Sequence, residues 1–376
     1  MKCKLGDLVQ SISDTYDFKG KYSVIFVNTS DVYDGNISGV KSNINKLPGQ
    51  AKKSIENDDI LFSEIRPKNK RFALVEKIDT KKYVVSTKLM VLRNNNHKLL
   101  DTKYLYLYLT SPTMIDYFQN EAESRSGTFP QITFKDNVAN VEIDLPSLKE
   151  QQHIVQKINT INEKIVLNNQ INDNLLELIS LIWNKYSKDI KFKITLQQLA
   201  QNIITGKTPN TKIKENYGTD IPFVKIPDMH NKVFIDETMQ SLSLLGANSQ
   251  KSKYLPPNSI MVSCIGTPGL VSLTGTTVQT NQQINSLILK PKYLYCTFLE
   301  LKSLKDKIGN LGSGGTTIKN LNKSDFSNLE ITVPDRESIL DKFNNIARPI
   351  FDQIHTNNIE TKKLMQLKAS LLNKYF

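Results

Sequence analysis

The chain has 376 residues, 39 % of them hydrophobic, which is enough to build two domain cores. Its net charge of +12 suits a polyanionic partner, because clustered cations displace counterions from phosphates. The three cysteines, Cys3, Cys264 and Cys296, lack CxxC spacing, which argues against a disulfide framework and a thiolate zinc site. No apolar signal core or run of about 18 apolar residues occurs, so we expect a cytoplasmic protein.

The first part of the chain has the pattern of a mixed α and β domain. Apolar, β-branched runs bounded by Gly, Asn and Lys predict strands, and they lie at residues 22–30, 59–65, 72–78 and 83–92. Residues 101–119 are typical of a helix. Together these elements predict a globular domain over residues 1–147.

From Leu148 to Tyr186 the pattern changes to that of one long helix. Isoleucine and leucine recur there at helical spacings or multiples of them, at Ile154, Ile158, Ile161, Ile165, Leu175, Ile179 and Ile182. Asn168, Asn169 and Asn172 interrupt this apolar seam. The length exceeds that of ordinary globular helices and favours a coiled-coil spacer, which we assign to residues 148–190.

The second part repeats this order. Predicted strands lie at residues 221–226, 259–265, 269–275 and 284–290, within a second domain at 191–334. From Asp335 onward the apolar residues again have helical spacing, at Phe343, Ile346, Ile350, Ile354, Leu364 and Leu371. Because proline suits the first turn of a helix but not its interior, we predict that the long helix of segment 335–376 begins at Pro349, after a shorter one.

The two parts align with each other without a gap around the start of each long helix. Residues 126–158 match residues 314–346, which pairs Gly127 with Gly315 and Pro146 with Pro334. An internal repeat of this length indicates a domain duplication. We therefore predict an α+β fold with two mixed α/β domains and two long helices that pack antiparallel as a coiled coil, related by a pseudo-two-fold axis. Two independent interaction helices are the alternative.

No catalytic motif stands out. Gly206-Lys207-Thr208 resembles the end of a phosphate-binding loop, but Gln201 occupies the position of the required first glycine. His97, His153, His230 and His355 fit no metal-ligand spacing. These observations favour a chain without a catalytic centre.

Basic and amide residues gather in the turn-rich stretches of both domains. Lys and Arg can fix register on phosphates, and Arg, Asn and Gln can read base edges. As a set, the candidate DNA-binding residues are Lys41, Arg66, Lys68, Lys70, Arg71, Arg125, Lys207, Thr208, Lys225, Lys232, Lys251, Lys253, Gln282, Gln283, Thr316, Thr317 and Lys319.

The sequence resembles the specificity subunits of type I restriction–modification systems over nearly its whole length. The resemblance rests on motifs that occur in the same order in both halves. They are Ser126-Gly127-Thr128 and Gly315-Thr316-Thr317, the segments 142–146 and 330–334 that end in proline, 150–154, 59–67, and Gly206-Lys207-Thr208-Pro209. The second copy departs at residues 336–339, where Arg-Glu-Ser-Ile replaces the Glu-Gln run.

The resemblance implies a division of labour between subunits. Each recognition domain would read one half of a split, asymmetric sequence in double-stranded DNA, and the helices would set the gap. The helices would also dock two methyltransferase subunits, which bind S-adenosylmethionine, and motor-nuclease restriction subunits would complete the complex. This chain would need no cofactor or metal. The candidate partner-binding residues are Ile154, Ile158, Ile161, Ile165, Phe343, Ile346, Ile350 and Ile354.

Three alternatives remain open at this point. A stand-alone enzyme would be active without partners. A coiled-coil scaffold for protein contacts would show no salt-sensitive affinity for DNA. A specificity subunit of a related system would work with a different catalytic partner.

Overall fold

The computed structural model describes residues 1–125, 127–188, 190, 192–306, 308 and 321–376. The chain forms two compact units, and each combines one globular domain with part of both long helices. The first unit comprises Met1–Lys164 and Lys363–Phe376, and the second comprises Ile165–Lys362. Among the described residues, no helix combines the length and hydropathy that a membrane span requires.

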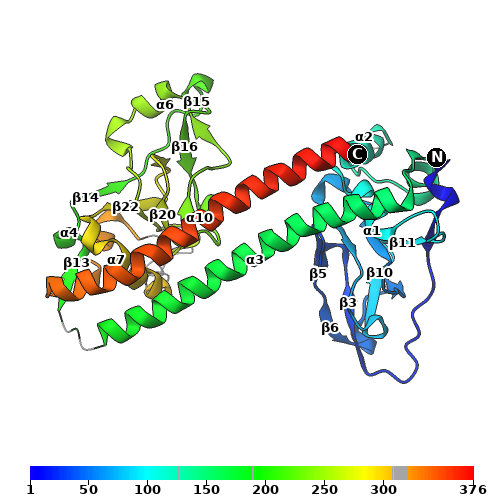
Figure 1. The fold of residues 1–376 in the computed structure, drawn as a ribbon, viewed down its shortest axis with the longest axis horizontal. Helices are drawn as coiled ribbons and strands as arrows, with labels where there is room; N and C mark the ends of the chain where they lie inside the picture. The colour runs from blue at the N-terminus through cyan, green and yellow to red at the C-terminus, as the bar shows by residue number, and fades with distance from the viewer. Residues whose placement is uncertain (126, 189, 191, 307, 309–320) are drawn as a thin grey trace. The chain divides into compact units, whose positions relative to one another are not determined.

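Two four-stranded sheets build the globular part of the first unit (Figure 1). One has the order β6-β3-β10-β7, with β6 Val40–Asn43, β3 Ser23–Val27, β10 Tyr83–Ser86 and β7 Ala51–Lys53. The other has the order β2-β11-β8-β9, with β2 Val9–Ile12, β11 Leu89–Asn94, β8 Ile60–Ser63 and β9 Phe72–Leu74. Two-stranded pairs are formed by β1 Lys2–Lys4 with β12 Glu142–Asp144 and by β4 Val32–Tyr33 with β5 Asn36–Ile37.

Two sequence predictions in the first unit need correction. The run at 83–92 is two strands, β10 and β11, which belong to different sheets. The predicted helix at 101–119 is also two elements, α1 Thr102–Leu109 and α2 Pro112–Arg125. Pro112 cannot donate a backbone hydrogen bond and therefore favours a new helix start. The Ser111 hydroxyl accepts from Met114 N at 3.3 Å and helps to cap that start.

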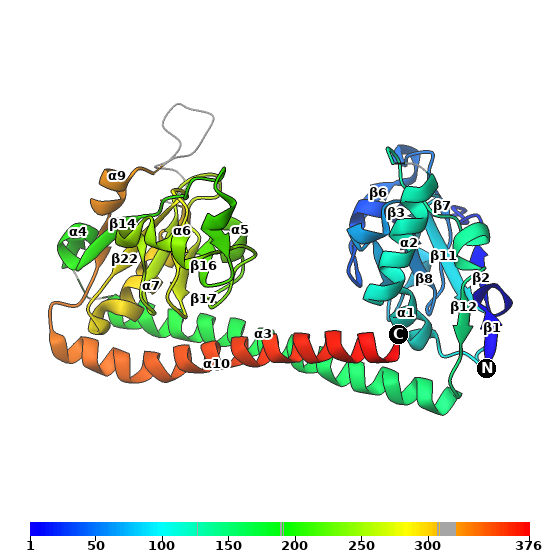
Figure 2. The same ribbon diagram turned by 90° about the horizontal axis from the view of Figure 1, so that it is seen from above.

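The second unit contains a five-stranded and a four-stranded sheet. The five-stranded sheet has the order β14-β22-β19-β20-β17, with β14 Asn202–Thr205, β22 Ile284–Ile288, β19 Ile260–Ser263, β20 Val271–Thr274 and β17 Phe234–Ile235. The four-stranded sheet has the order β15-β18-β16-β21, with β15 Tyr217–Gly218, β18 Ser241–Leu242, β16 Ile221–Val224 and β21 Gln279–Thr280. The short helices are α4 Leu196–Leu199, α5 Ile226–Met229, α6 Leu244–Asn248, α7 Leu294–Ser303 and α9 Lys323–Ser327 (Figure 2).

The duplication is visible in the strand pairing. In the first unit β1 pairs antiparallel with β12, which ends four residues before the long helix. In the second unit β13 Lys193–Thr195 pairs in the same way with β23 Glu330–Thr332. The strand order β2-β11-β8-β9 likewise corresponds to β14-β22-β19-β20. Each domain is thus closed by pairing of its first and last strands.

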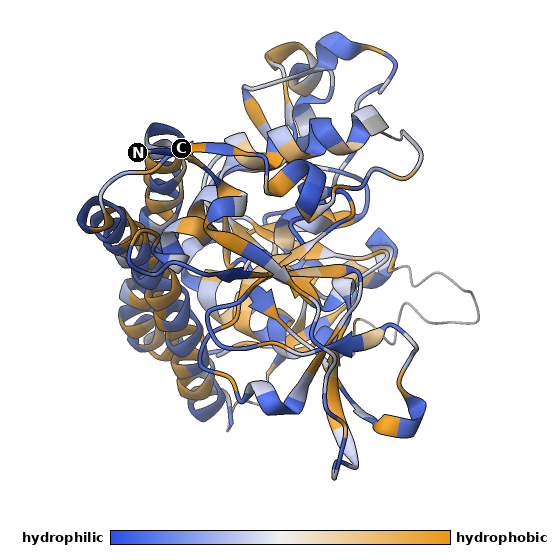
Figure 3. Cartoon of the chain, turned by 90° about the vertical axis from the view of Figure 1, so that its right-hand side faces the viewer, coloured by the Kyte–Doolittle hydropathy of each residue, from blue (hydrophilic) through white to orange (hydrophobic). Residues whose placement is uncertain are grey.

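The two long helices, α3 Leu148–Ser187 and α10 Glu337–Tyr375, pack antiparallel in each unit. In the second unit the Trp183 and Phe343 rings lie 4.8 Å apart, and Asn168 Nδ2 donates to Thr361 Oγ1 at 3.3 Å. In the first unit Lys157 Nζ donates to the Tyr375 hydroxyl at 3.4 Å. Later residues of α3 therefore meet earlier residues of α10, and the predicted antiparallel pair is confirmed. Figure 3 shows hydrophobic and hydrophilic positions alternating along both helices.

A polar layer interrupts the apolar seam between the helices. Asn168, Asn172, Asn357 and Thr361 are each less than a tenth exposed. Asn172 Oδ1 accepts from Asn357 Nδ2 at 2.8 Å, so the amides bind across the interface. Because buried amides bind well only in one alignment, this layer favours a single register of the helices.

The predicted helix start at Pro349 is wrong, because α10 runs through this residue without a break. Pro349 removes the hydrogen bond that would reach the Asn345 carbonyl. Both residues are exposed, so water can satisfy that carbonyl, and the proline ring faces solvent. The buried face of α10 near this point consists of Phe343, Ala347 and Phe351.

Replacing Phe343 with Ala should destabilise the second unit by about 3–5 kcal/mol, because it leaves a cavity among fully buried side chains. Trp183, the single tryptophan, reports this transition through its fluorescence during denaturant unfolding. Ile346→Ala on the same helix is the control: Ile346 is 36 % exposed, and the change should cost less than about 1 kcal/mol. Equal losses of unfolding free energy in the two variants would contradict the central position of Phe343 in the core.

Candidate nucleic-acid interface

The basic loop of the first unit, residues 64–71, lies at one edge of the sheet β2-β11-β8-β9. It connects the end of β8 with the start of β9, and Ser63 of β8 lies opposite Leu89, the first residue of β11. Ser63 N donates to the Arg71 carbonyl at 2.8 Å, which closes the loop at its base. This geometry presents residues 64–70 beyond the end of the sheet.

Hydrogen bonds fasten this loop to neighbouring segments. Arg66 N donates to the Pro130 carbonyl at 3.1 Å, and Lys68 N donates to Gln119 Oε1 of α2 at 3.1 Å. Pro67 is buried. The loop therefore offers its side chains from a fixed backbone.

Three of the four basic residues in this loop already have partners within the chain. Lys68 Nζ lies 2.9 Å from Asp116 Oδ1, and Lys70 Nζ lies 3.5 Å from Asp34 Oδ2. Arg71 Nη1 donates to the Ser30 carbonyl at 2.6 Å. Arg66 is exposed, and its Nη2 makes a marginal hydrogen bond to the Thr128 carbonyl at 3.5 Å.

One acidic residue stands among these cations. Glu64 lies at the start of the loop, where burial raises the pKa of its carboxyl group and Lys53 and Lys88 oppose that rise. Lys53 is buried; its Nζ donates to the Leu89 carbonyl at 2.8 Å, and burial lowers its pKa. Glu64 thus serves as a counter-charge near the buried ammonium group.

In the second unit, the corresponding edge of the five-stranded sheet brings several predicted residues together. Strands β14 and β19 end there, and β22, β20 and β17 begin there. The loops at this edge carry Lys207, Thr208, Lys232, Gln282 and Gln283. Four strand intervals of roughly 4.8 Å make the edge roughly 19 Å long.

Hydrogen bonds orient the amide side chains at this edge. Thr208 Oγ1 donates to Gln282 Oε1 at 2.6 Å, and Asn281 Nδ2 donates to Gln283 Oε1 at 2.9 Å. Gly206 permits the close approach, because a Cβ there would lie 2.1 Å from the Asn281 carbonyl oxygen. Glycine is therefore needed at position 206 because no larger residue could pack against this loop. This packing explains the glycine without a bound nucleotide.

The other predicted lysines of the second unit, Lys225, Lys251 and Lys253, lie in segments next to these edge loops. Lys225 follows β16, beside Asn281, and its Nζ donates to Gln240 Oε1 at 2.6 Å. Lys251 follows Gln250, whose Nε2 donates to the Lys207 carbonyl at 2.9 Å, and Lys253 ends the same short turn. Lys232 also lines a cavity of about 630 Å³ with Lys302, Lys305 and residues of both long helices.

Several predicted residues do not join either edge in the described part of the chain. Lys41 lies in β6, an outer strand of the other sheet of the first unit. Thr316, Thr317 and Lys319 lie outside the described residues. Arg125 is the last residue of α2, and its side chain also lies outside the described part.

The two edges are equivalent positions of the repeated domain. In the first unit Ile132 N donates to the Glu64 carbonyl at 2.8 Å. In the second unit Leu321 N donates to the Cys264 carbonyl at 2.9 Å. The same backbone contact therefore joins the strand-end loop to the segment that precedes the last strand in both domains.

Five of the eight predicted partner-binding residues are buried within this chain. Ile154 and Ile158 belong to the core of the first unit, Ile161 is also buried, and Phe343 and Ile354 belong to the core of the second unit. Ile165 and Ile350 are half-buried, and Ile346 is 36 % exposed. The buried side chains stabilise this chain and are not available to another. Sequence reasoning missed the exposed apolar residues of α3, which are Val166, Leu167, Leu178 and Leu181.

Nothing in the described residues resembles a catalytic constellation. Burial raises the pKa of Cys264 to about 11 and that of Cys296 to about 12, so neither thiol is a nucleophile near neutral pH. No group of three or more His, Cys, Asp or Glu that could hold a metal occurs among these residues. His355 Nε2 lies 2.8 Å from Asp236 Oδ1 and its ring stacks on Phe234, so this pair fastens α10 to the domain.

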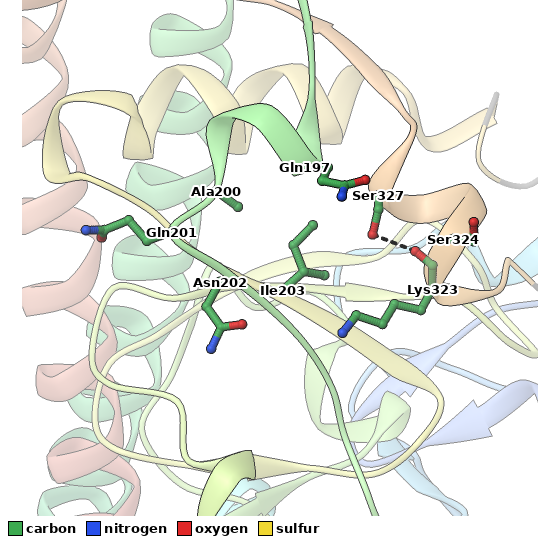
Figure 4. Close-up of a pocket in the computed structure, with 8 residues that line it drawn as sticks. All are labelled: Gln197, Ala200, Gln201, Asn202, Ile203, Lys323, Ser324 and Ser327. Carbon is green, nitrogen blue, oxygen red and sulfur yellow. Dashed lines mark hydrogen bonds between the residues drawn. The ribbon is translucent and has the colours of Figure 1, made fainter.

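A shallow pocket of about 590 Å³ lies beside α4, β14 and α9 in the second unit (Figure 4). Figure 4 shows Lys323 extending toward Asn202 and Ile203, while Gln201 points away. Ser327 Oγ donates to the Lys323 carbonyl at 2.7 Å. The described residues that line the pocket include no carboxylate, histidine or thiol, so they offer no acid–base or nucleophilic group.

Comparisons with known proteins agree with this arrangement. A family model described as the type I restriction modification DNA specificity domain matches residues 1–177 and again residues 189–369. The specificity subunit of the type I restriction enzyme HindI from Haemophilus influenzae is 38 % identical, over 98 % of this chain and 96 % of its own length. The MjaIX specificity subunit from Methanocaldococcus jannaschii is 26 % identical, over 73 % of this chain and 68 % of its own.

A solved structure supports the fold independently. The crystal structure of a type I restriction–modification S subunit from M. genitalium covers 100 % of this chain and 96 % of that one, with a TM-score of 0.60. Sequence identity is 14 %, so this likeness concerns the fold. The predicted architecture of two recognition domains and two long helices is confirmed.

Replacing Arg66, Lys68, Lys70 and Arg71 together with Ala should weaken nonspecific DNA binding and flatten its salt dependence. Each lost phosphate contact should reduce the slope of log K against log salt by about 0.9. The measurement is fluorescence anisotropy of a labelled duplex over a salt series. A control with the same charge change replaces four exposed lysines of the helices, Lys149, Lys185, Lys342 and Lys363. Equal slopes for the two variants would remove the basic loop from the interface.

Proposed function

Because the chain belongs to the type I restriction–modification DNA specificity family, we propose that its two globular domains each read one half of a split DNA target. The chain is a non-catalytic specificity subunit of a type I system. The recognition domains are residues 1–147 and 191–334, and the helical segments are residues 148–190 and 335–376. Methylation and cleavage then belong to other subunits.

The observation that carries this proposal is the equivalence of the two sheet edges. Each domain presents polar and basic side chains at the same edge, beyond the ends of β8 in one unit and β19 in the other. Cations such as Arg66 and Lys207 suit phosphates or guanine, and the oriented amides of Gln282 and Gln283 suit adenine. The edge loops of the two domains differ in sequence, although the domains share their backbone arrangement. The two domains can therefore read different half-sites.

The long helices serve two further purposes in this proposal. Their antiparallel pairing sets the gap between the half-sites, and their outer faces dock two methyltransferase subunits, which carry S-adenosylmethionine. Leu167, Leu178 and Leu181 share the side of α3 that is turned away from the buried seam, and each is about half exposed. This apolar surface takes the place of the buried isoleucines as the docking candidate. Restriction subunits complete the assembly.

Exchanging residues 1–147 for the same domain of a relative should change one half-site and leave the other unchanged. The exchanged chain is expressed with its cognate methyltransferase, and methylated sites are mapped by sequencing the host DNA. The reciprocal exchange of residues 191–334 is the matched control and should change the other half-site. A change in both half-sites from a single exchange would refute independent reading.

Lengthening both helices together tests the spacer role. Seven residues are inserted after Lys164 in α3 and seven after Lys362 in α10, where both helices pass from one unit to the other. Two added turns keep the apolar stripe in register and add about 10 Å. The gap should lengthen by up to roughly three base pairs of about 3.4 Å each, with both half-sites unchanged. Methylation at the original gap would show that the partners set the spacing.

A further inference from the structure

Arg66 has a backbone conformation that side chains disfavour. Its φ of 46° and ψ of 75° lie in the left-handed region, where the Cβ of an ordinary residue comes too close to the backbone. Neither asparagine nor aspartate, which tolerate this region best, occupies the position. Strain of this kind persists where the surrounding structure holds it, and often where a function requires it.

In the second domain a glycine provides the left-handed residue after the corresponding strand. Strand β8 corresponds to β19, so Arg66 corresponds to Gly266, which has φ 76°. The turn that precedes each strand is also shared, because Asp58 has φ 72° and Asn258 has φ 64°. Glycine at position 66 would therefore satisfy the backbone of this loop at lower conformational cost. The side chain of Arg66, and not its backbone, gives a reason for arginine here.

Of the four basic side chains in the loop, that of Arg66 has the weakest contacts within the described part of the chain. Lys68 and Lys70 face Asp116 and Asp34, and Arg71 is bonded to a backbone carbonyl. Within the described part of the chain Arg66 makes one marginal side-chain hydrogen bond, which leaves most of its donors available, and its backbone is fixed by bonds to Pro130 and Asn69. A planar group with paired donors on a rigid support matches the O6 and N7 acceptors of guanine in the major groove.

We propose that Arg66 reads a guanine in the half-site of the first recognition domain, and that its strained backbone is retained for this contact. The assignment rests on the proposed function above. Lys68, Lys70 and Arg71 position the loop and meet phosphates. The proposal separates base reading from backbone binding within one short segment.

The test uses the full chain with its cognate methyltransferase and compares four variants, R66G, R66A, R66K and D58G. Asp58 has the same left-handed conformation as Arg66 but lies at the opposite end of β8. Methylation motifs are mapped by sequencing, and the Tm of each purified chain is measured. A good bidentate contact discriminates by about 1–3 kcal/mol, or roughly 5- to 150-fold.

In R66G and R66A, one guanine position of one half-site should lose its selectivity by that factor, while the other half-site keeps its sequence. R66K should restore it only in part, because lysine lacks the paired donors. The Tm of R66G should stay the same or rise, as should that of D58G, which keeps the wild-type motif.

Three results would overturn the assignment. An unchanged methylation motif in R66G would show that Arg66 does not contact a base. A uniform loss of methylation at all sites, with the motif intact, would show that Arg66 contacts a phosphate. A lower Tm for R66G shows that the arginine holds the loop together. Failure of the wild-type complex to methylate any split sequence would instead refute the proposed function, so the two failures are distinguishable.

Discussion

The packing of α3 against α10 in the core of the second unit is the constraint on which the architecture depends. Trp183 contacts Phe343 and donates from Nε1 to Glu300 Oε1 at 2.7 Å, and Glu300 Oε2 accepts from Thr332 N at 3.0 Å. One carboxylate thereby ties a long helix to α7 and to the last strand of the domain. Burial of these rings fixes the direction and register with which both helices leave the domain, and the amide layer at Asn172 agrees with that register.

Much of the fold could be predicted from the sequence, because duplication and helical periodicity are long-range patterns. Isoleucine spacing predicted the long helices and the duplication predicted their antiparallel pairing, whereas the continuation of α10 through Pro349 depends on which face meets solvent. The candidate site was harder to predict from the sequence than the fold. The partners of Lys68 and Lys70 are carboxylates at Asp116 and Asp34, remote in sequence, so their neutralisation cannot be read from the loop alone. The left-handed conformation of Arg66 likewise cannot be read from its residue type, because arginine does not favour a positive φ.

The two recognition domains show how one scaffold can support different chemistry. Four strands of one sheet in each domain have the same order, and the same backbone contact closes the strand-end loop in each. At this edge the first domain presents guanidinium and ammonium groups, and the second presents oriented amides such as Gln282 beside Lys207. Side chains in the edge loops can therefore change without altering the core, because the core is built by other residues, which lie in the strands.

The division of the two units along the chain has a consequence for synthesis on the ribosome. Leu371, Leu372 and Phe376 pack against the core of the first unit, where the Phe376 ring lies 5.3 Å from Tyr104. The first domain is thus completed by residues that are translated after the second domain. Contacts of such long sequence separation form late in folding. A chain that stops before residue 371 leaves apolar surface of its first domain uncovered, although that domain is translated before the second.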